Sequence, residues 1–504
     1  MTAFENRILN YMEAGFPILY LNTFEDGKAR EAILCTSSKI AGRSTILQWD
    51  GTDRICDIRT GEVKYETSNC TLADILDDRI SIRGDAAGHQ VMILKNIDTF
   101  MDDPAVMARL NKMAELIYSG TLDATIVILS PILRIPKEIE KYITVTDMDY
   151  LTVDEIRSVI RKFADEYDIT ISERLEKELA NALKGLSEFE IQSIMQLALS
   201  ESTDITRSQI DLVFEQKQQM IKKAGILEMI PLKESLEDIG GLENLKGWLR
   251  RKAKVLADMD GAKAFGVDVP KGVLIAGVPG CGKSISAKAA AKLFNIPLLR
   301  LDMGRLLGKY VGESEANMRK AIELAEAISP CVLWIDELEK AFAGIGGEGS
   351  GAEVTTRLFG SFLTWLQEKE SPVFVVATAN DITKLPPELL RKGRFDEIFY
   401  VGLPKREERR KIFEIHIRKR RKDDFSDILM DNLLDKTKGC SGADIEGIVR
   451  ESVEAAFADG KPRLTTDDLL NAIGNTHPLS EIMKEAIEKM QKEYETRKFK
   501  NASR

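Results

Sequence analysis

The sequence predicts an α/β fold in which two parallel sheets, each covered by helices, are each followed by a small helical part. Three observations support this fold class. Short apolar runs alternate with longer stretches in which apolar residues recur at helical spacing, as in chains whose strands and helices alternate. The chain becomes mostly helical twice, over about residues 153–223 and 405–474. Its 504 residues also exceed the length of one ordinary domain.

Eight apolar runs are expected to form the strands, four in each half of the chain. Because strands that alternate with helices usually pair in parallel, the two groups of four predict two separate sheets. The expected strands are Ile18–Asn22, Thr45–Asp50, Val91–Asn96, Thr125–Ser130, Gly272–Ala276, Leu298–Asp302, Cys331–Ile335 and Val373–Ala379.

The expected domain organisation repeats one plan, an α/β part and then a helical part. A short stretch between the two copies is expected to be a linker, and the alternating Glu and Lys residues near the end predict a solvated helix. The expected boundaries are 1–222 for the front region (α/β about 1–150, helical about 151–222), 223–236 for the linker, 237–404 for the second α/β domain, 405–477 for its helical domain and 478–504 for the charged helix.

The composition argues against several classes of protein. A formal net charge of -10 does not fit a general nucleic-acid binder, which would carry a net basic footprint. The six cysteines show no C-x-x-C spacing, which argues against a disulfide framework and favours a reducing compartment. The apolar runs are far shorter than the ~20 residues needed to span a bilayer, and Met1–Glu5 does not begin a signal peptide. We therefore expect a cytoplasmic protein without membrane insertion.

A phosphate-binding loop is predicted between the strand Gly272–Ala276 and an Ala-rich helix at Ile285–Phe294. Its glycines let the backbone turn N–H groups toward phosphate oxygens, and the helix N-terminus adds partial positive charge. Lys283 is expected to reach the β- and γ-phosphates of ATP, and the hydroxyl of Ser284 to ligate Mg²⁺. The pattern G-x-x-x-x-G-K-[ST] is matched by Gly277, Val278, Pro279, Gly280, Cys281, Gly282, Lys283 and Ser284.

Two acids follow the apolar strand Cys331–Ile335. Alone, such a pair usually marks a strand that meets solvent, but here it lies about fifty residues after a phosphate loop. Asp336 is expected to hold Mg²⁺ through its water shell, and Glu337 to activate the attacking water as general base. Asn380 ends the next strand and is expected to orient that water and sense the γ-phosphate; the alternative is a turn-forming Asn.

At this point a family resemblance is visible. Thr378-Ala379-Asn380 followed by Leu385–Asp396 resembles the second region of homology of the AAA branch of AAA+ ATPases, and the likeness covers about residues 237–474. The resemblance implies that Arg391 and Arg394 are arginine fingers that act on the nucleotide of a neighbouring subunit. It therefore implies a homo-oligomer, a hexameric ring, with ATP and Mg²⁺ bound at its subunit interfaces. The alternative is two surface arginines near a turn.

Further positions match the same family. The resemblance implies that the backbone of one segment contacts adenine, that a helical histidine packs near the base and ribose, and that the lid signature includes Ala443 where other AAA+ branches carry an arginine. A lone histidine on a helix is otherwise usually structural. The implied residues are Asp238, Ile239, Gly240, His416, Gly442 and Ala443.

The segment around Tyr310 and Val311 resembles the first pore loop of the family, in which an aromatic–aliphatic–Gly trio grips an extended polypeptide. The alternative is a tyrosine that anchors the loop to its own domain. The glycine-rich run Gly344–Gly351 is expected to be a second pore loop or a flexible connection.

The front half is interpreted as a degenerate copy of the same fold. Asn22–Ala29 can be laid on the phosphate loop position for position, but Ala29 replaces the Mg²⁺-binding serine and two acids face the phosphates. Asp98 is followed by Thr99 where a catalytic glutamate is needed, and only Arg134 lies near the finger positions. The alternative is an unrelated α/β domain. A degenerate half before one active module resembles the hypothetical chloroplast reading-frame AAA proteins of cyanobacteria and plastids, which would place the chain in the plastid stroma if plastid-encoded.

Two functions remain open at the level of sequence. One is a motor that couples ATP hydrolysis to the remodelling or translocation of a protein substrate, with the front half recruiting substrate or adaptor. The other is an ATP-controlled scaffold or switch that binds a partner through the front half without threading it. A DNA-handling ATPase is the weaker third reading, because no DNA-binding module is recognisable and the net charge is acidic.

Overall fold

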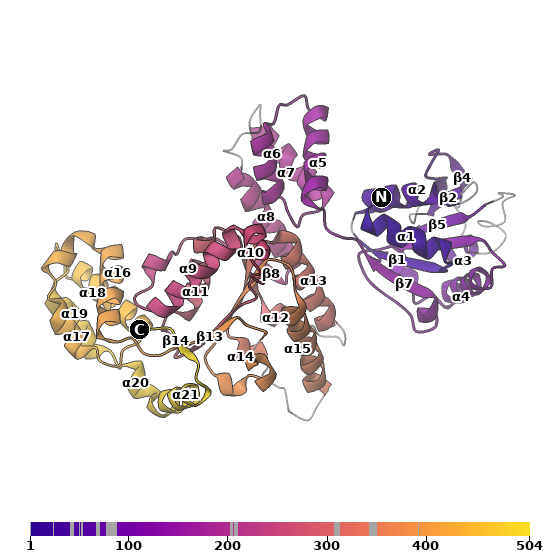
Figure 1. Ribbon diagram of the computed structural model, residues 1–504. Helices are drawn as coiled ribbons and strands as arrows, with labels where there is room; N and C mark the ends of the chain where they lie inside the picture. Colours follow the sequence, from indigo (N-terminus) through magenta and orange to yellow (C-terminus); the bar gives the residue numbers. More distant parts are fainter. Residues whose placement is uncertain are drawn as a thin grey trace. The chain divides into compact units, whose positions relative to one another are not determined.

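The computed structural model describes residues 2–23, 25–40, 45–49, 51, 54–66, 71–76, 88–201, 205, 210–306, 313–341, 350–391 and 393–504 (Figure 1). The chain divides into two compact units. The first unit comprises Met1–Leu151 with Ser187–Ser193, and the second comprises Thr152–Leu186 with Ile194–Arg504. Among the described residues, no helix is both long enough and apolar enough to cross a membrane.

The first unit contains a seven-stranded sheet in the order β4-β3-β2-β5-β6-β1-β7. Five of its strands, from β2 to β7 in that order, pair in parallel, and β3 and β4 add an antiparallel hairpin at one edge. The strands are β1 (Ile18–Asn22), β2 (Thr45–Trp49), β3 (Arg54–Asp57), β4 (Val63–Glu66), β5 (Gln90–Lys95), β6 (Ala124–Leu129) and β7 (Ile143–Asp147).

Helices cover both faces of this sheet. Apolar residues of α1 (Ala3–Glu13) and α2 (Asp26–Ser37) share one core with inward-facing residues of β1 and β5. Alternate residues of the same strands share a second core with α3 (Leu72–Ile75) and α4 (Pro104–Tyr118). Burial on both faces explains why these strands read as continuous apolar runs in the sequence.

The second unit contains a sheet in the order β14-β13-β9-β12-β11-β10-β8. Five of its parallel strands, β9 to β13, lie in the spatial order β13-β9-β12-β11-β10. Numbered along the chain, this order is five-one-four-three-two, as it is for the five parallel strands of the first unit. The predicted repeat of one α/β plan is therefore confirmed. The strands are β8 (Leu227–Ile230), β9 (Gly272–Gly277), β10 (Leu298–Leu301), β11 (Cys331–Ile335), β12 (Val373–Ala379), β13 (Glu397–Val401) and β14 (Lys500–Asn501).

Figure 1 shows α9 and α11 on one side of this sheet and α13 and α15 on the other, and the two apolar cores agree. Small residues of α11 let it approach the sheet closely, since four of its alanines are fully buried. The helices of this region are α9 (Glu243–Ala257), α10 (Met259–Ala264), α11 (Lys283–Phe294), α12 (Met303–Leu306), α13 (Glu313–Ile328), α14 (Leu338–Ala341) and α15 (Ser350–Glu368). Short 3-10 helices are η1 (Ile97–Phe100), η2 (Glu140–Tyr142), η4 (Leu236–Asp238), η5 (Ile382–Lys384), η6 (Pro387–Leu390) and η7 (Lys422–Asp427).

The helical part expected at 151–222 consists of α5 (Val153–Glu166), α6 (Glu173–Ala182), α7 (Glu188–Glu201) and α8 (Ile210–Ala224). Most of it belongs to the second unit, whereas the first turns of α7 belong to the first unit. Within the second unit, Nζ of Lys184 donates to the carbonyl of Ser329 at 3.1 Å. Ile221 of α8 lies in the same apolar core as α13.

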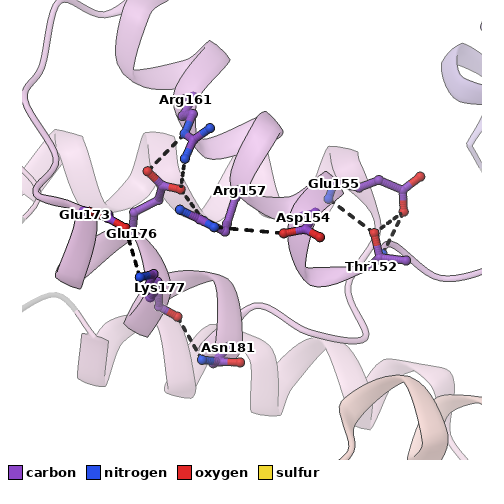
Figure 2. A network of polar contacts seen from close by, with 9 residues as sticks. All are labelled: Thr152, Asp154, Glu155, Arg157, Arg161, Glu173, Glu176, Lys177 and Asn181. Atoms are coloured by element: carbon purple, nitrogen blue, oxygen red, sulfur yellow. Dashed lines mark hydrogen bonds and ion pairs between the residues drawn. The ribbon is translucent and has the colours of Figure 1, made fainter.

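A buried carboxylate joins α5 to α6, as Figure 2 shows. Glu176 is 6% exposed and accepts from Nε of Arg157 at 2.5 Å and from Nε of Arg161 at 3.1 Å. Burial acts to raise the pKa of Glu176, but the hydrogen bonds from Arg161 and Arg157 outweigh it and hold that pKa below its ordinary value.

The helical domain after the second sheet has its own apolar core, formed by the buried faces of its helices. Its helix starts are fixed by side chains, for example by Ser441, whose Oγ accepts from the backbone N–H of Asp444 at 3.2 Å. The helices are α16 (Arg406–Arg420), α17 (Met430–Lys436), α18 (Gly442–Ala458) and α19 (Thr466–Asn475).

Two expected boundaries differ from the structure. The expected linker 223–236 contributes β8, which pairs antiparallel with β10. The expected helix 478–504 consists of α20 (Leu479–Ile482), α21 (Lys484–Arg497) and then β14, which extends the sheet beside β13. The fully buried Ala502 fixes this end, because its N–H donates to Tyr400 at 2.8 Å and its carbonyl accepts from the N–H of Asn244 at 3.0 Å.

Candidate active site

The phosphate-loop sequence forms a tight turn between β9 and α11. Gly280 and Gly282 have φ values of +70° and +92°, in the left-handed region that favours glycine. A side chain at Gly277 would overlap the backbone of Val401 on β13, so the loop begins where only glycine fits. The N–H of Ala443, at the start of α18, donates to the carbonyl of Gly280 at 2.9 Å and joins the lid to the loop.

Lys283 points back over this loop. Its side chain is buried, and its Nζ donates to the carbonyls of Gly277 at 2.9 Å and Val278 at 2.8 Å. Burial lowers the pKa of Lys283 to about 8. The amine thus lies in an apolar setting with only neutral acceptors at hydrogen-bonding distance, which favours an anionic ligand beside it.

A hydroxyl and a carboxylate meet at the start of α11. The Oγ of Ser284 donates to Oδ1 of Asp336 at 3.1 Å, and Oγ1 of Thr378 donates to the same oxygen at 2.5 Å. Such hard oxygen donors fit Mg²⁺, which takes one or two protein ligands and keeps water for the remaining positions. The residues present therefore suit the metal that the sequence predicts here.

Glu337, the expected general base, is held in an unusual backbone conformation with φ of +51°. Its Oε1 accepts from Nδ2 of Asn380 at 3.3 Å, and its Oε2 lies 2.5 Å from Nζ of Lys340. The N–H of Asn380 in turn donates to Oε1 of Glu339 at 3.0 Å. The ends of β11 and β12 thus place the acid and the amide side by side, as expected from parallel neighbouring strands.

These groups line one cleft of about 390 Å³. At its far end lie the backbone of Ile239 and Gly240 and the side chains of Ile412, Ile415 and His416, an apolar wall suited to a planar base. Gly240 is needed there, because a side chain would overlap Ile412. Burial lowers the pKa of His416, which keeps the imidazole neutral near pH 7.

Of the predicted site residues that the structure describes, most line this cleft and four do not. Gly277 and Val278 lie beneath the loop and accept from Lys283. Arg391 and Arg394 follow η6, and neither belongs to the cleft of its own chain. The predicted residues that line it are Asp238, Ile239, Gly240, Pro279, Gly280, Cys281, Gly282, Lys283, Ser284, Asp336, Glu337, Asn380, His416, Gly442 and Ala443.

Arg394 is half-buried, and within the described part of the chain its buried NH1 atom has no hydrogen-bond partner. The pore-loop residues Tyr310 and Val311 lie outside the described residues, as does the glycine-rich run up to residue 349.

Sequence reasoning missed Thr378, Glu339 and Glu446. Thr378 and Glu446 line the cleft, and Glu339 holds the backbone of Asn380. For Thr378 a partial signal existed, because it lies two places before Asn380, which directly follows β12, and residues two apart along a strand point to the same face of the sheet. Its partner at the end of β11 does not follow from that spacing.

The corresponding loop of the first unit is built differently. Residues 278–282 separate β9 from α11, which is five residues, whereas residues 23–25 separate β1 from α2, which is three. The position-for-position match with the phosphate loop is therefore wrong beyond the strand, because Gly27 lies within α2, whereas its counterpart Gly282 precedes α11. Glu25 fills the turn, its carboxylate accepting from the N–H of Glu188 at the start of α7, and burial raises the pKa of Glu25.

Other front-half positions also lack the geometry of the second unit. Asp98 lies in η1 beyond the end of β5 and accepts from the hydroxyl of Ser130 at 3.1 Å. Arg134 pairs with Asp102. Beyond the ends of β5 and β6, these side chains of the first unit therefore bond to one another.

Comparison with known proteins gives four consecutive family matches. Residues 4–148 match the N-terminal domain of SpoVK-like AAA ATPases, and residues 154–224 match their second domain. Residues 273–403 match the ATPase family associated with various cellular activities (AAA), and residues 427–471 match the AAA+ lid domain.

Two relatives match over nearly the whole chain, and a third matches half of it. The uncharacterized AAA domain-containing protein ycf46 of Guillardia theta is 36% identical over 480 residues, covering 95% of this chain and 92% of the relative. The ycf46 protein of Pyropia yezoensis is 35% identical over 480 residues, with 95% of each chain covered. A cell division cycle protein 48 homolog of Archaeoglobus fulgidus is 34% identical over 258 residues, which is 50% of this chain and 35% of that protein.

Proposed function

We propose that this chain, which belongs to the ycf46 family of AAA proteins, hydrolyses ATP with Mg²⁺ and works as an oligomer, a hexameric ring, that remodels a protein substrate. One observation carries the ATPase part of the proposal. The ends of β9, β11 and β12 bring Lys283, Ser284, Asp336, Glu337 and Asn380 around a single cleft that also has an apolar end for a base.

The chemistry assigns a role to each of these groups. Loop N–H groups and Lys283 bind the phosphates, while Ile239, Gly240 and His416 pack around the base. Ser284 and Asp336 would hold Mg²⁺, which neutralises charge on the phosphate oxygens when bound.

Glu337 accepts the proton of the attacking water, and Asn380 orients both. To reach that water the Glu337 carboxylate must release Lys340, which is exposed and free to turn away. Positive charge from Arg391 and Arg394 of a neighbouring subunit stabilises the transferring phosphoryl group. Their absence from their own cleft, among the described residues, supports this role.

Two variants test the proposed reaction. We expect Lys283→Ala to lose nucleotide binding, because it removes the one buried cation of the loop. Glu337→Gln keeps the shape of the site but not its base, so it should bind ATP and hydrolyse it ~10²- to 10⁴-fold more slowly. Phosphate release and the binding of a fluorescent ATP analogue measure both. Full ATP turnover by Glu337→Gln would show that Glu337 is not the general base.

The scaffold reading is favoured by one observation, the first unit's short, acid-filled loop, which suits a partner-binding module better than a second motor. Tyr310→Ala separates the two readings. Loss of substrate processing with ATP turnover retained supports the remodelling motor, and unchanged processing supports the scaffold.

A further inference from the structure

We propose that Thr378 is a positioning residue for the ATPase reaction: its buried hydroxyl fixes the carboxylate of Asp336 and the backbone of Glu337 relative to each other. The inference rests on the proposed function, and it gives a role to a residue that lies in a matched motif but received no role from the sequence. Thr378 is 1% exposed, so its hydroxyl has no access to bulk water as an alternative partner.

The hydroxyl group acts as donor and acceptor at once. Oγ1 of Thr378 donates its hydrogen to Oδ1 of Asp336 at 2.5 Å and accepts from the backbone N–H of Glu337 at 3.1 Å. The register of the sheet sets this up. Ile335 pairs with Ala377, so Thr378 of β12 lies opposite the residue that follows β11.

The bond to the Glu337 N–H has a mechanical consequence. A non-glycine residue at φ of +51° adopts a strained conformation that persists only when its surroundings hold it. Thr378 holds the N–H of that residue, while Asn380 contacts its carboxylate. Without the hydroxyl, the backbone of Glu337 loses the acceptor that fixes the direction in which its side chain leaves the strand.

The bond to Asp336 has a second consequence. Oδ1 of Asp336 accepts from both Ser284 and Thr378. When the Ser284 hydroxyl turns to the metal, Thr378 is the donor that keeps the carboxylate oriented. A hydrogen bond from an unstrained, buried donor is the usual way in which a ligating carboxylate is positioned.

Three substitutions test the proposal. Thr378→Val keeps the shape and removes the hydroxyl, whereas Thr378→Ser keeps the hydroxyl. Thr378→Ala serves if the valine variant does not fold. The matched control is Thr437→Val, because Thr437 is also fully buried in this unit and donates to a helix carbonyl at 2.8 Å, yet does not line the cleft.

We expect Thr378→Val to lower kcat ~10- to 100-fold, the loss of one hydrogen bond to a charged group, with a smaller rise in KM for ATP in the presence of Mg²⁺. Thr378→Ser should return kcat to within a few-fold of the parent. A purely structural threonine would instead behave like Thr437→Val, which lowers the unfolding midpoint without a selective fall in kcat. An unchanged kcat in Thr378→Val, or no rescue by serine, overturns the proposal.

Binding gives a readout that does not depend on turnover. A fluorescent ATP analogue is titrated with excess Mg²⁺ and with EDTA. In Thr378→Val the EDTA affinity should equal the parent's, because Lys283 and the loop are untouched, while the gain on adding Mg²⁺ should shrink. Equal gains in both proteins contradict the proposal. If the parent itself binds but never hydrolyses ATP, the proposed function fails, and this titration still decides the role of Thr378.

Discussion

At the scale of single residues, Lys217 places an amine inside the second unit. It is 1% exposed, and its Nζ donates to the carbonyl of Ala182 at 2.7 Å. Burial lowers the pKa of Lys217 to about 7, against an ordinary value near 10.4 in the unfolded chain. The folded protein therefore releases this proton at lower pH than the unfolded chain does.

This difference predicts how stability depends on pH. Between about pH 7 and pH 10 the unfolded chain binds more protons at this site than the folded one, so stability rises with pH, by at most ~1.4 kcal/mol per pH unit. Lys217→Met keeps the volume and removes the titration. Urea unfolding from pH 6.5 to 9 should show a smaller rise in the variant than in the parent. If the free energy of unfolding rose equally with pH in parent and variant, the lowered pKa of Lys217 would be contradicted.

The sequence predicts much of the cleft at this scale and misses the rest for a physical reason. Lys283, Asp336 and Glu337 are found because charged residues next to glycines or an apolar strand stand out from a buried background. Thr378 does not stand out, because threonine is an ordinary strand former. Its role depends on the register between β11 and β12, which spacing along one strand does not give.

At the scale of elements, the packing of α5 on α6 depends on Glu176 and its two arginines (Figure 2). Because the folded pKa of Glu176 is lowered, its contribution is present above the unfolded pKa of about 4.3 and is lost as pH falls through the lower folded value. The direction of the shift thus predicts weaker packing in acid.

We expect Glu176→Gln to lower the free energy of unfolding by about 1–3 kcal/mol at pH 7, since two guanidinium groups lose their charged partner. Below about pH 4 the deficit should narrow, because the unfolded parent then binds a proton at this carboxyl that the folded protein does not yet bind. Denaturant unfolding at both pH values measures this. Glu173→Gln is the control: its exposed carboxylate pairs, among the residues that the structure describes, only with Lys177 one turn away, so no measurable loss is expected. A similar loss in both variants would argue against a special role for Glu176.

Strands were predictable where both faces are buried, and missed where they are not. All eight expected runs are strands, within one or two residues at the ends. The hairpin strands β3 and β4 were missed because Arg54–Asp57 and Val63–Glu66 carry too few apolar residues to stand out. The shortened loop before α2 was also missed, since Gly27 matches a phosphate-loop glycine in the sequence but lies inside a helix.

At the scale of the whole molecule, the proposed fingers make a prediction about mixed assemblies. Lys283→Ala and Arg391→Ala subunits should each be nearly inactive alone. When mixed, some interfaces join an intact loop from one subunit to an intact arginine from the next. We therefore expect ATP turnover to reappear and to peak at intermediate ratios, in a phosphate-release assay.

The control mixes Lys283→Ala with Glu337→Gln, whose defects lie in the same cleft. In this mixture every subunit with an intact phosphate loop lacks the general base, so no recovery of ATP turnover is expected. No recovery in the first mixture would mean that Arg391 acts within its own chain or not at all.

The contact between the carboxylate of Glu25 and the start of α7 bears on how many ATP molecules each chain of the assembly binds. A helix start attracts anions, and here the anion is tethered to the polypeptide, so it neither dissociates nor turns over. Calorimetric titration of the intact chain should accordingly saturate at one equivalent of ATP per polypeptide. The front unit would present the same face to a bound partner throughout the cycle of ATP binding and hydrolysis.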